Sequence, residues 1–249
     1  TALPRQPPLQ PLVDWSWDLL SDPDRTLLAR LSVFFGWTLE AAVAVTADPV
    51  GDAPPIATTN LSLETLDGLS RLVDRSLVIV EHGETTRYRL LETIRQYARD
   101  RLVAAGEGAL MREAHLTFFL ELALRAEQAL SGPAMIPWLR HLDFEIDNIR
   151  SAIEWAFEAH PEDALRLGIA LNPYWRARSF VAEATELLHR AALVASSLPL
   201  DDGDAGHART ILVARVLAAG ALSHAPGGTA AAGLASAEPA LAPGRSGHE

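Results

Sequence analysis

A single β-branched stretch interrupts a chain whose apolar residues otherwise recur mostly at helical spacing. Residues 76–90 read SLVIVEHGETTRYRL, an apolar run, a group of turn-forming residues and a second short run. This pattern is typical of two antiparallel strands joined by a tight turn. Apolar residues before and after it recur at intervals of three and four, which indicates helices. The sequence therefore predicts a mainly α fold with one β-hairpin.

Capping signals place the helices before the hairpin. In SDPDRTLLARLSVF, Asp22 is expected to cap a helix that Gly36 ends, with proline in its first turn. Thr38 is expected to cap a third short helix, and residues 51–60 are expected to form a loop. Ser62 is then the expected cap of the helix that precedes the hairpin.

Apolar stripes predict which side chains of these helices face inward. For the first helix, the stripe is Leu9, Leu12, Val13, Trp17 and Leu20. For the helix before the hairpin it is Leu63, Leu66, Leu69, Leu72 and Val73, and for the helix after it Leu91, Ile94, Ala98 and Leu102. Helices followed by a hairpin and a further helix are the pattern of a winged-helix domain, expected over residues 12–104.

From residue 107 the pattern is almost purely helical. Helices are expected near residues 107–130, 135–158, 162–175, 180–195 and 207–223. Residues 174–193 align weakly with residues 222–241 at an offset of 48, which predicts helix–turn–helix repeats of tetratricopeptide type. We therefore expect a Pro-rich linker at residues 1–11, a helical tetratricopeptide-like array at 105–225, and a disordered or degenerate repeat at 226–249.

Composition excludes several kinds of chemistry. The chain has 249 residues, a net charge of −11 and no cysteine, and all of its basic residues other than histidine are arginine. A Walker A loop and a Schiff base both need lysine, and thiolate sites need cysteine. The histidines, including His115, do not fall at metal-ligand spacing, so we predict no catalytic site and no metal site. No segment is long and apolar enough to span a bilayer, and a cytoplasmic location is expected. Since the sequence begins with threonine, it is expected to be a piece of a longer protein.

Arginines near the hairpin suggest two different uses. Arg87, Arg89, Arg95, Arg99 and Arg101 could contact DNA or a phosphate, but residues 76–113 hold six arginines against six acids. The helix before the hairpin, which would enter the major groove, leans acidic. Phosphates lining the groove disfavour such a helix. This balance favours an internal use of the hairpin over DNA binding.

Other polar and aromatic residues could form binding sites or pack in the core. Trp15 and Trp17 could form a ligand platform, but at least one ring is expected to pack between helices. Glu145, Asp147 and Asn148 could hold a metal or partner, but a cap or a polar contact to the preceding helix is favoured. Candidate partner-binding anchors on the array are Trp138, Trp155, Tyr174, Trp175 and Arg176, each of which could instead belong to the inter-helix core.

Several of these segments occur in a familiar order. They are LVDWSWDLLSDPDRTLLARLSVFFGWTLEAA, LSRLVDRSLVIVE, RYRLLETIRQYARDRL and EIDNIRSAIEWA, followed by the helical repeats. Over roughly residues 5–225, the chain resembles the region that follows the nucleotide-binding domain in bacterial STAND regulators, including LuxR-type activators and ATPase-linked cyclases.

This resemblance implies an upstream NB-ARC-like ATPase domain that carries ATP or ADP, with no cofactor in the chain itself. The winged helix would pack against that domain and hold it off, while a separate domain would bind DNA. Many relatives place a His-Asp pair where this sequence has Leu91 and Glu92, and neither residue suits a phosphate contact. Arg87, Arg89 and Arg95 are the substitute candidates for nucleotide contact.

The sequence as a whole predicts a non-catalytic regulatory segment of a STAND-type signalling ATPase or transcriptional regulator. Its array would sense a ligand or a protein partner, and no membrane partner is expected. Two alternatives remain open: a DNA-binding winged-helix transcription factor and a stand-alone helical scaffold that binds peptides.

Overall fold

The computed structural model describes residues 10–47 and 57–197, and these are mainly helical with one β-hairpin, as predicted. The helices before the hairpin are α1 (Gln10–Asp18), α2 (Asp22–Leu31), α3 (Leu39–Thr46) and α4 (Ala57–Asp74). The hairpin is β1 (Val78–Glu81) and β2 (Arg87–Leu90), followed by α5 (Glu92–Ala104). The remaining described helices are α6 (Gly108–Ala129), α7 (Met135–Ala159), α8 (Pro161–Ala177) and α9 (Val181–Ser197).

The elements up to α5, here called the winged-helix part, follow the order of a winged helix. Strands β1 and β2 pair antiparallel, with Val78 opposite Leu90. Between α2 and α3, Trp37 adds a short bridge to β2. Its N–H donates to the Tyr88 carbonyl at 2.9 Å, and the Tyr88 N–H donates back at 2.8 Å. Helices α2, α3 and α4 pack on one another, and α5 packs on α2.

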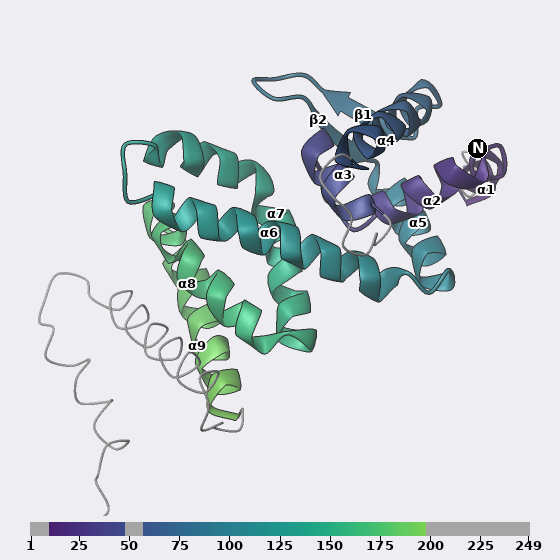
Figure 1. The fold of residues 1–249 in the computed structure, drawn as a ribbon. Helices are drawn as coiled ribbons and strands as arrows, with labels where there is room; N and C mark the ends of the chain where they lie inside the picture. Colours follow the sequence, from purple (N-terminus) through teal and green to yellow (C-terminus); the bar gives the residue numbers. More distant parts are fainter. Residues whose placement is uncertain (1–9, 48–56, 198–249) are drawn as a thin grey trace, which may run out of the picture.

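Helices α6 to α9, here called the helical array, continue from α5 without a separate linker domain (Figure 1). Helix α6 contacts α3 and α5 of the winged-helix part and α7 and α8 of the array. One buried cluster runs through both parts, from Leu28 and Phe34 to Phe119 and Trp175. The two parts therefore share a hydrophobic core among the described residues.

Three helices end in the same backbone motif. At the end of α5, the Gly106 N–H donates to Val103 and the Glu107 N–H donates to Leu102. Gly106 has a φ of +78°, the left-handed conformation that this motif requires. Ser76 and Ser179, with φ of 58° and 60°, occupy the equivalent positions after α4 and α8. These turns direct the chain into β1, α6 and α9.

Several predicted helix boundaries are wrong, and one is confirmed. Ser21 caps α2 instead of Asp22, accepting a hydrogen bond from the Asp24 N–H. The helix ends at Leu31, before Gly36, because the following segment turns to form the bridge with β2. Helix α4 begins at Ala57, which overturns the predicted Ser62 cap and the end of the predicted loop. Thr38 caps α3 as expected.

Some residues predicted to face inward are exposed. Leu63 and Leu66 of α4 lie outside its buried stripe, which is formed by Thr65, Leu69 and Leu72. The predicted face was too wide because it included leucines that lie outside this stripe. Two further predicted inward leucines, Leu12 and Leu91, are also exposed; Leu91 precedes the first turn of α5.

Some predictions fall outside the described residues. These are most of the 1–11 linker, the helix at 207–223, the second repeat copy at 222–241 and the 226–249 tail.

Candidate functional site

The main candidate site is the junction between the winged-helix part and α7, where a buried amide joins the two. The Asn148 side chain is 1% exposed. Its Oδ1 accepts from the Phe35 N–H at 2.9 Å, and its Nδ2 donates to the Gly36 carbonyl at 2.7 Å. It also donates to Glu145 Oε2 at 2.8 Å. One side chain of the array thus provides hydrogen bonds for two backbone groups of the segment leading to the bridge.

A buried ion pair lies beside this amide. Glu145, 4% exposed, accepts a hydrogen bond from the Arg87 guanidinium, which also donates to the Phe144 carbonyl at 3.2 Å. The Arg87 side chain is only 13% exposed, and its charged group lies 5.5 Å from the centroid of the Phe144 ring. We call Arg87, Glu145, Asn148 and the backbone of Phe35 and Gly36 the junction network. Its members join β2, the bridge segment and α7.

His115 of α6 lies next to Asn148 of the junction network. Burial lowers the pKa of His115 to about 4, against an opposing hydrogen bond with Asn148. The imidazole packs 5.1 Å from the ring of Phe34 and 4.6 Å from that of Phe119. His115 is therefore a neutral core histidine.

The arginines near the hairpin have different surroundings. Arg87 belongs to the junction network, whereas Arg89 pairs with Glu81 on the adjacent strand and is 43% exposed. Arg95 pairs with Glu92 and lies 4.4 Å from the Phe35 ring centroid. Arg101 donates to the Tyr97 hydroxyl. Arg99 makes no ion pair within the described residues. Each of the three nucleotide-contact candidates therefore already has a carboxylate partner, namely Glu145, Glu81 and Glu92.

The predicted partner-binding anchors are also separated. Tyr174 and Trp175 are buried in the core of the array, so the inter-helix role describes both rings. Trp138 and Trp155 are partly buried, and the Trp155 indole donates to Glu113 at 3.4 Å. Arg176 is exposed at the end of α8. Arg176 is thus the most accessible of these candidates, and Trp138 and Trp155 are partly accessible.

The tryptophan pair near the N-terminus behaves as expected. Trp17 packs edge-on against Tyr97 at 5.6 Å between ring centroids, whereas Trp15 is exposed. One ring therefore packs between α1 and α5, as the sequence predicted.

The exposed face of α4 carries mixed charge. Arg71 donates to both carboxylate oxygens of Asp24, with a shortest distance of 2.7 Å. Burial by itself would raise the pKa of Asp24, but the hydrogen bonds from Arg71 and Ser21 and the nearby positive charges hold it below its usual value. The charge of Arg71 is thus used within the fold, which leaves three acids on this helix and Arg75 directly after its last residue.

Two kinds of feature are absent from the part of the chain that the structure describes. No cluster of three or more possible metal ligands occurs there. No helix there is long and apolar enough to cross a membrane.

The junction network was missed by sequence reasoning, although the sequence contains a signal for it. Glu145 and Asn148 occupy the same helical stripe as the buried apolar residues Leu142, Ile149 and Ala152. Polar residues on a buried stripe need buried partners. The sequence favoured a cap or a contact to the preceding helix for Glu145 and Asn148. Their partners instead lie about 60 and 110 residues earlier in the sequence.

Comparisons with known proteins find relatives in mycobacteria. The chain is 37% identical over 188 residues to proteins of Mycobacterium tuberculosis and Mycobacterium bovis that carry the provisional name HTH-type transcriptional regulator. The match covers 73% of this chain but 20% of those proteins. The chain thus spans about a fifth of the length of the curated relatives it matches.

A second relative has no described role. An uncharacterised protein of Mycobacterium tuberculosis is 40% identical over 97 residues, covering 38% of this chain and 23% of that protein. No family model and no solved structure matches the chain. The comparisons therefore relate the chain to mycobacterial regulators, without supporting an ATPase context.

Replacing Asn148 should destabilise the protein strongly. Asn148→Ala leaves the Phe35 N–H and the Gly36 carbonyl without a buried partner and removes one of the two partners of Glu145, so we expect a loss of about 3 kcal/mol in the free energy of unfolding. The exposed neighbour Asp147, paired with Arg150 at 3.0 Å, provides the control: Asp147→Ala should cost under about 0.5 kcal/mol. Urea denaturation followed by circular dichroism measures both. Equal losses for the two variants would contradict the role of the network.

His115 should make stability depend on pH in a defined range. Its pKa falls from 6.5 in the unfolded chain to about 4 in the folded one, so the unfolded state binds more protons between these values. The contribution of His115 to the free energy of unfolding is therefore at its full value above pH 6.5. It falls by about 3 kcal/mol as the pH drops toward 4.

Asparagine at this position keeps a donor near Asn148 but cannot titrate. His115→Asn should therefore flatten the loss of stability between pH 6.5 and 4, whereas His141→Asn, at an exposed position of α7, should not. Urea titrations at a series of pH values measure this. An unchanged slope in His115→Asn would show that His115 is not buried in its neutral form.

Proposed function

We propose that this segment is a non-catalytic regulatory part of a larger transcriptional regulator, in which the hairpin is fixed to the helical array. The observation that carries this proposal is the junction network. Its buried ion pair and the hydrogen bonds of its buried amide connect β2 and the bridge segment to α7. Buried polar contacts of this kind favour one relative arrangement of two parts over others.

The hairpin and the first turn of α5 have little free positive charge for DNA. Arg87 is committed to Glu145, Arg89 pairs with Glu81, and Arg95 pairs with Glu92. A wing that grips DNA needs arginines or lysines free to replace counterions on phosphates. These pairings favour an internal, structural use of the hairpin.

The finer form of the proposal follows the STAND resemblance. An upstream NB-ARC-like ATPase domain, carrying ATP or ADP, would pack against the winged-helix part. The array would bind an effector, and the shared core would transmit that event to the winged-helix part. Of the nucleotide-contact candidates, Arg89 suits an approaching domain best, because its side chain is the most exposed of the three.

A second candidate function is DNA binding by the winged helix itself. The relatives' names favour it, since they describe HTH-type transcriptional regulators. In this reading α4 would enter the major groove, and Arg75 at its C-terminal end would contribute to phosphate binding.

A DNA-binding measurement separates the two functions. Fluorescence anisotropy with a labelled random duplex at about 50 mM salt tests for sequence-independent electrostatic binding to the phosphate backbone, which DNA-binding proteins share. The regulatory proposal predicts no binding by the chain under these conditions.

Salt-sensitive binding that Arg75→Glu weakens at least tenfold, and that Arg166→Glu on α8 leaves unchanged, would contradict the regulatory proposal. It would establish the winged helix as the DNA-binding element.

A further inference from the structure

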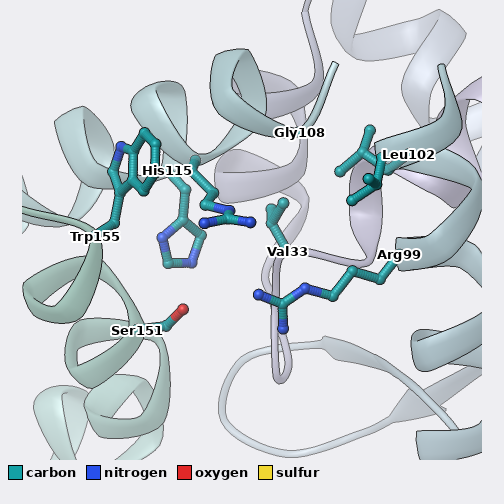
Figure 2. Close-up of a pocket in the computed structure, with 9 residues that line it drawn as sticks. Val33, Arg99, Leu102, Gly108, His115, Ser151 and Trp155 are labelled. Atoms are coloured by element: carbon teal, nitrogen blue, oxygen red, sulfur yellow. The ribbon is translucent and has the colours of Figure 1, made fainter. Parts of the chain in front are cut away.

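A small pocket lies where α5 of the winged-helix part meets α6 and α7 of the array (Figure 2). The pocket has a volume of about 20 Å³, and it opens to solvent. The lining residues are Val33, Arg99, Leu102, Val103, Gly108, Arg112, His115, Ser151 and Trp155. Figure 2 shows Arg99, His115 and Ser151 approaching the same space from different helices.

Two arginines give this pocket excess positive charge. Arg99 has no ion pair among the described residues; burial lowers its pKa, and the charges of Arg112 and Arg95 lower it further. The negative charges of Asp100 and Glu92 raise the pKa of Arg99 and so partly oppose this lowering. Arg112 lies 4.9 Å from the Trp155 ring centroid, and its nearest carboxylate is that of Glu158 at 3.9 Å. Neither arginine is fully neutralised by a close carboxylate.

A buried nitrogen in the pocket wall has no partner. His115 is 3% exposed, and its Nε2 makes no hydrogen bond in the structure. The bond with Asn148 raises the pKa of His115, as expected when Nδ1–H donates to the amide oxygen. Nε2 of the neutral ring is then an acceptor. The pocket therefore offers two cationic donors, the Ser151 hydroxyl and one acceptor.

The first turn of α6 adds to the positive potential. Gly108, the first residue of this 22-residue helix, lines the pocket, and no side chain caps the helix. The Glu107 carboxylate, which precedes it, is bound to Arg30 at 2.7 Å instead. Free N–H groups and the helix dipole at such an end favour an anion.

We propose that this pocket binds an oxyanion that still carries a proton, with inorganic hydrogen phosphate as the best-fitting ligand. The arginines would bind its charged oxygens, and its O–H would donate to His115 Nε2. Sulfate at neutral pH has no proton to donate, so it would leave Nε2 without a partner. A phosphate monoester loses its second proton with a pKa near 6, so at pH 7.5 it would fit less well.

The size of the pocket is compatible with partial enclosure of such an ion. A volume of about 20 Å³ admits one or two water-sized groups. One or two phosphate oxygens would therefore lie inside, and the remainder of the ion would occupy the open mouth beside Arg99.

The inference goes beyond the proposed function and is tested separately from it. An ion bound here would connect α5 to α6 and α7 at a second place, away from Arg87 and Glu145. Its binding would then favour the arrangement that the junction network already holds.

Isothermal titration calorimetry of the whole chain at pH 7.5 and constant ionic strength tests the proposal with phosphate, methyl phosphate and sulfate. We expect phosphate to bind at least tenfold more tightly than either of the others. Arg99→Gln and Arg112→Gln should each weaken phosphate binding about tenfold or more, since each removes charge-assisted hydrogen bonds. Arg166→Gln, at an exposed position of α8 paired with Asp163, is the matched control and should bind as the parent does.

His115→Asn tests the selectivity separately, because it keeps a donor toward Asn148 but has no equivalent of Nε2. It should reduce the preference for phosphate over sulfate to less than threefold. Circular dichroism confirms that each variant is folded. No heat with phosphate up to about 10 mM, equal binding of phosphate and sulfate by the parent, or unchanged binding by the folded Arg99→Gln variant would overturn the proposal.

Discussion

The relative position of the two parts of this protein depends on the burial of Asn148. An amide that is almost fully buried needs partners for its two donors and two acceptor positions. Any position left without a partner lowers the stability of the fold by the free energy of its desolvation. Here the partners are the Phe35 and Gly36 backbone and the Glu145 carboxylate. Because the backbone groups belong to the segment that pairs with β2, the amide is satisfied only when the hairpin and the array are correctly placed.

The buried ion pair follows from the same constraint. Glu145 accepts from Asn148 and from Arg87, so its charge is compensated on two sides. A buried carboxylate with one partner removed would be costly. The array therefore selects a single position for β2, and Arg87 cannot also serve an outside ligand while this arrangement persists.

Sequence reasoning predicted the local elements better than the contacts between them. The hairpin and helices α5 to α9 follow from periodicity, and the Thr38 cap follows from its side chain. Boundaries such as the start of α4 were missed, because a run of small polar residues suits both a loop and a helix. The junction network could not be located, because its partners are distant in sequence and only the fold brings them together.

The arginines near the hairpin also show that the sequence predicts local pairs better than contacts between distant residues. Counting charges predicted that the hairpin region is locally neutral, and several of the pairs within the helix and hairpin are seen. Counting charges could not distinguish Arg87 from Arg99. Arg87 forms an ion pair with Glu145 across the junction, whereas Arg99 has no ion pair among the described residues. That difference separates a structural contact from a candidate anion site.

The junction network and the shared core imply that the winged-helix part and the array move as one rigid unit. The absence of cysteine allows specific spin labelling at Thr85→Cys in the hairpin turn and Glu186→Cys on α9, both at exposed positions. Distances between these labels, measured by double electron–electron resonance, should form one narrow distribution that broadens in Asn148→Ala. A broad distribution in the otherwise unaltered chain would contradict the account, because it would show that the two parts move independently.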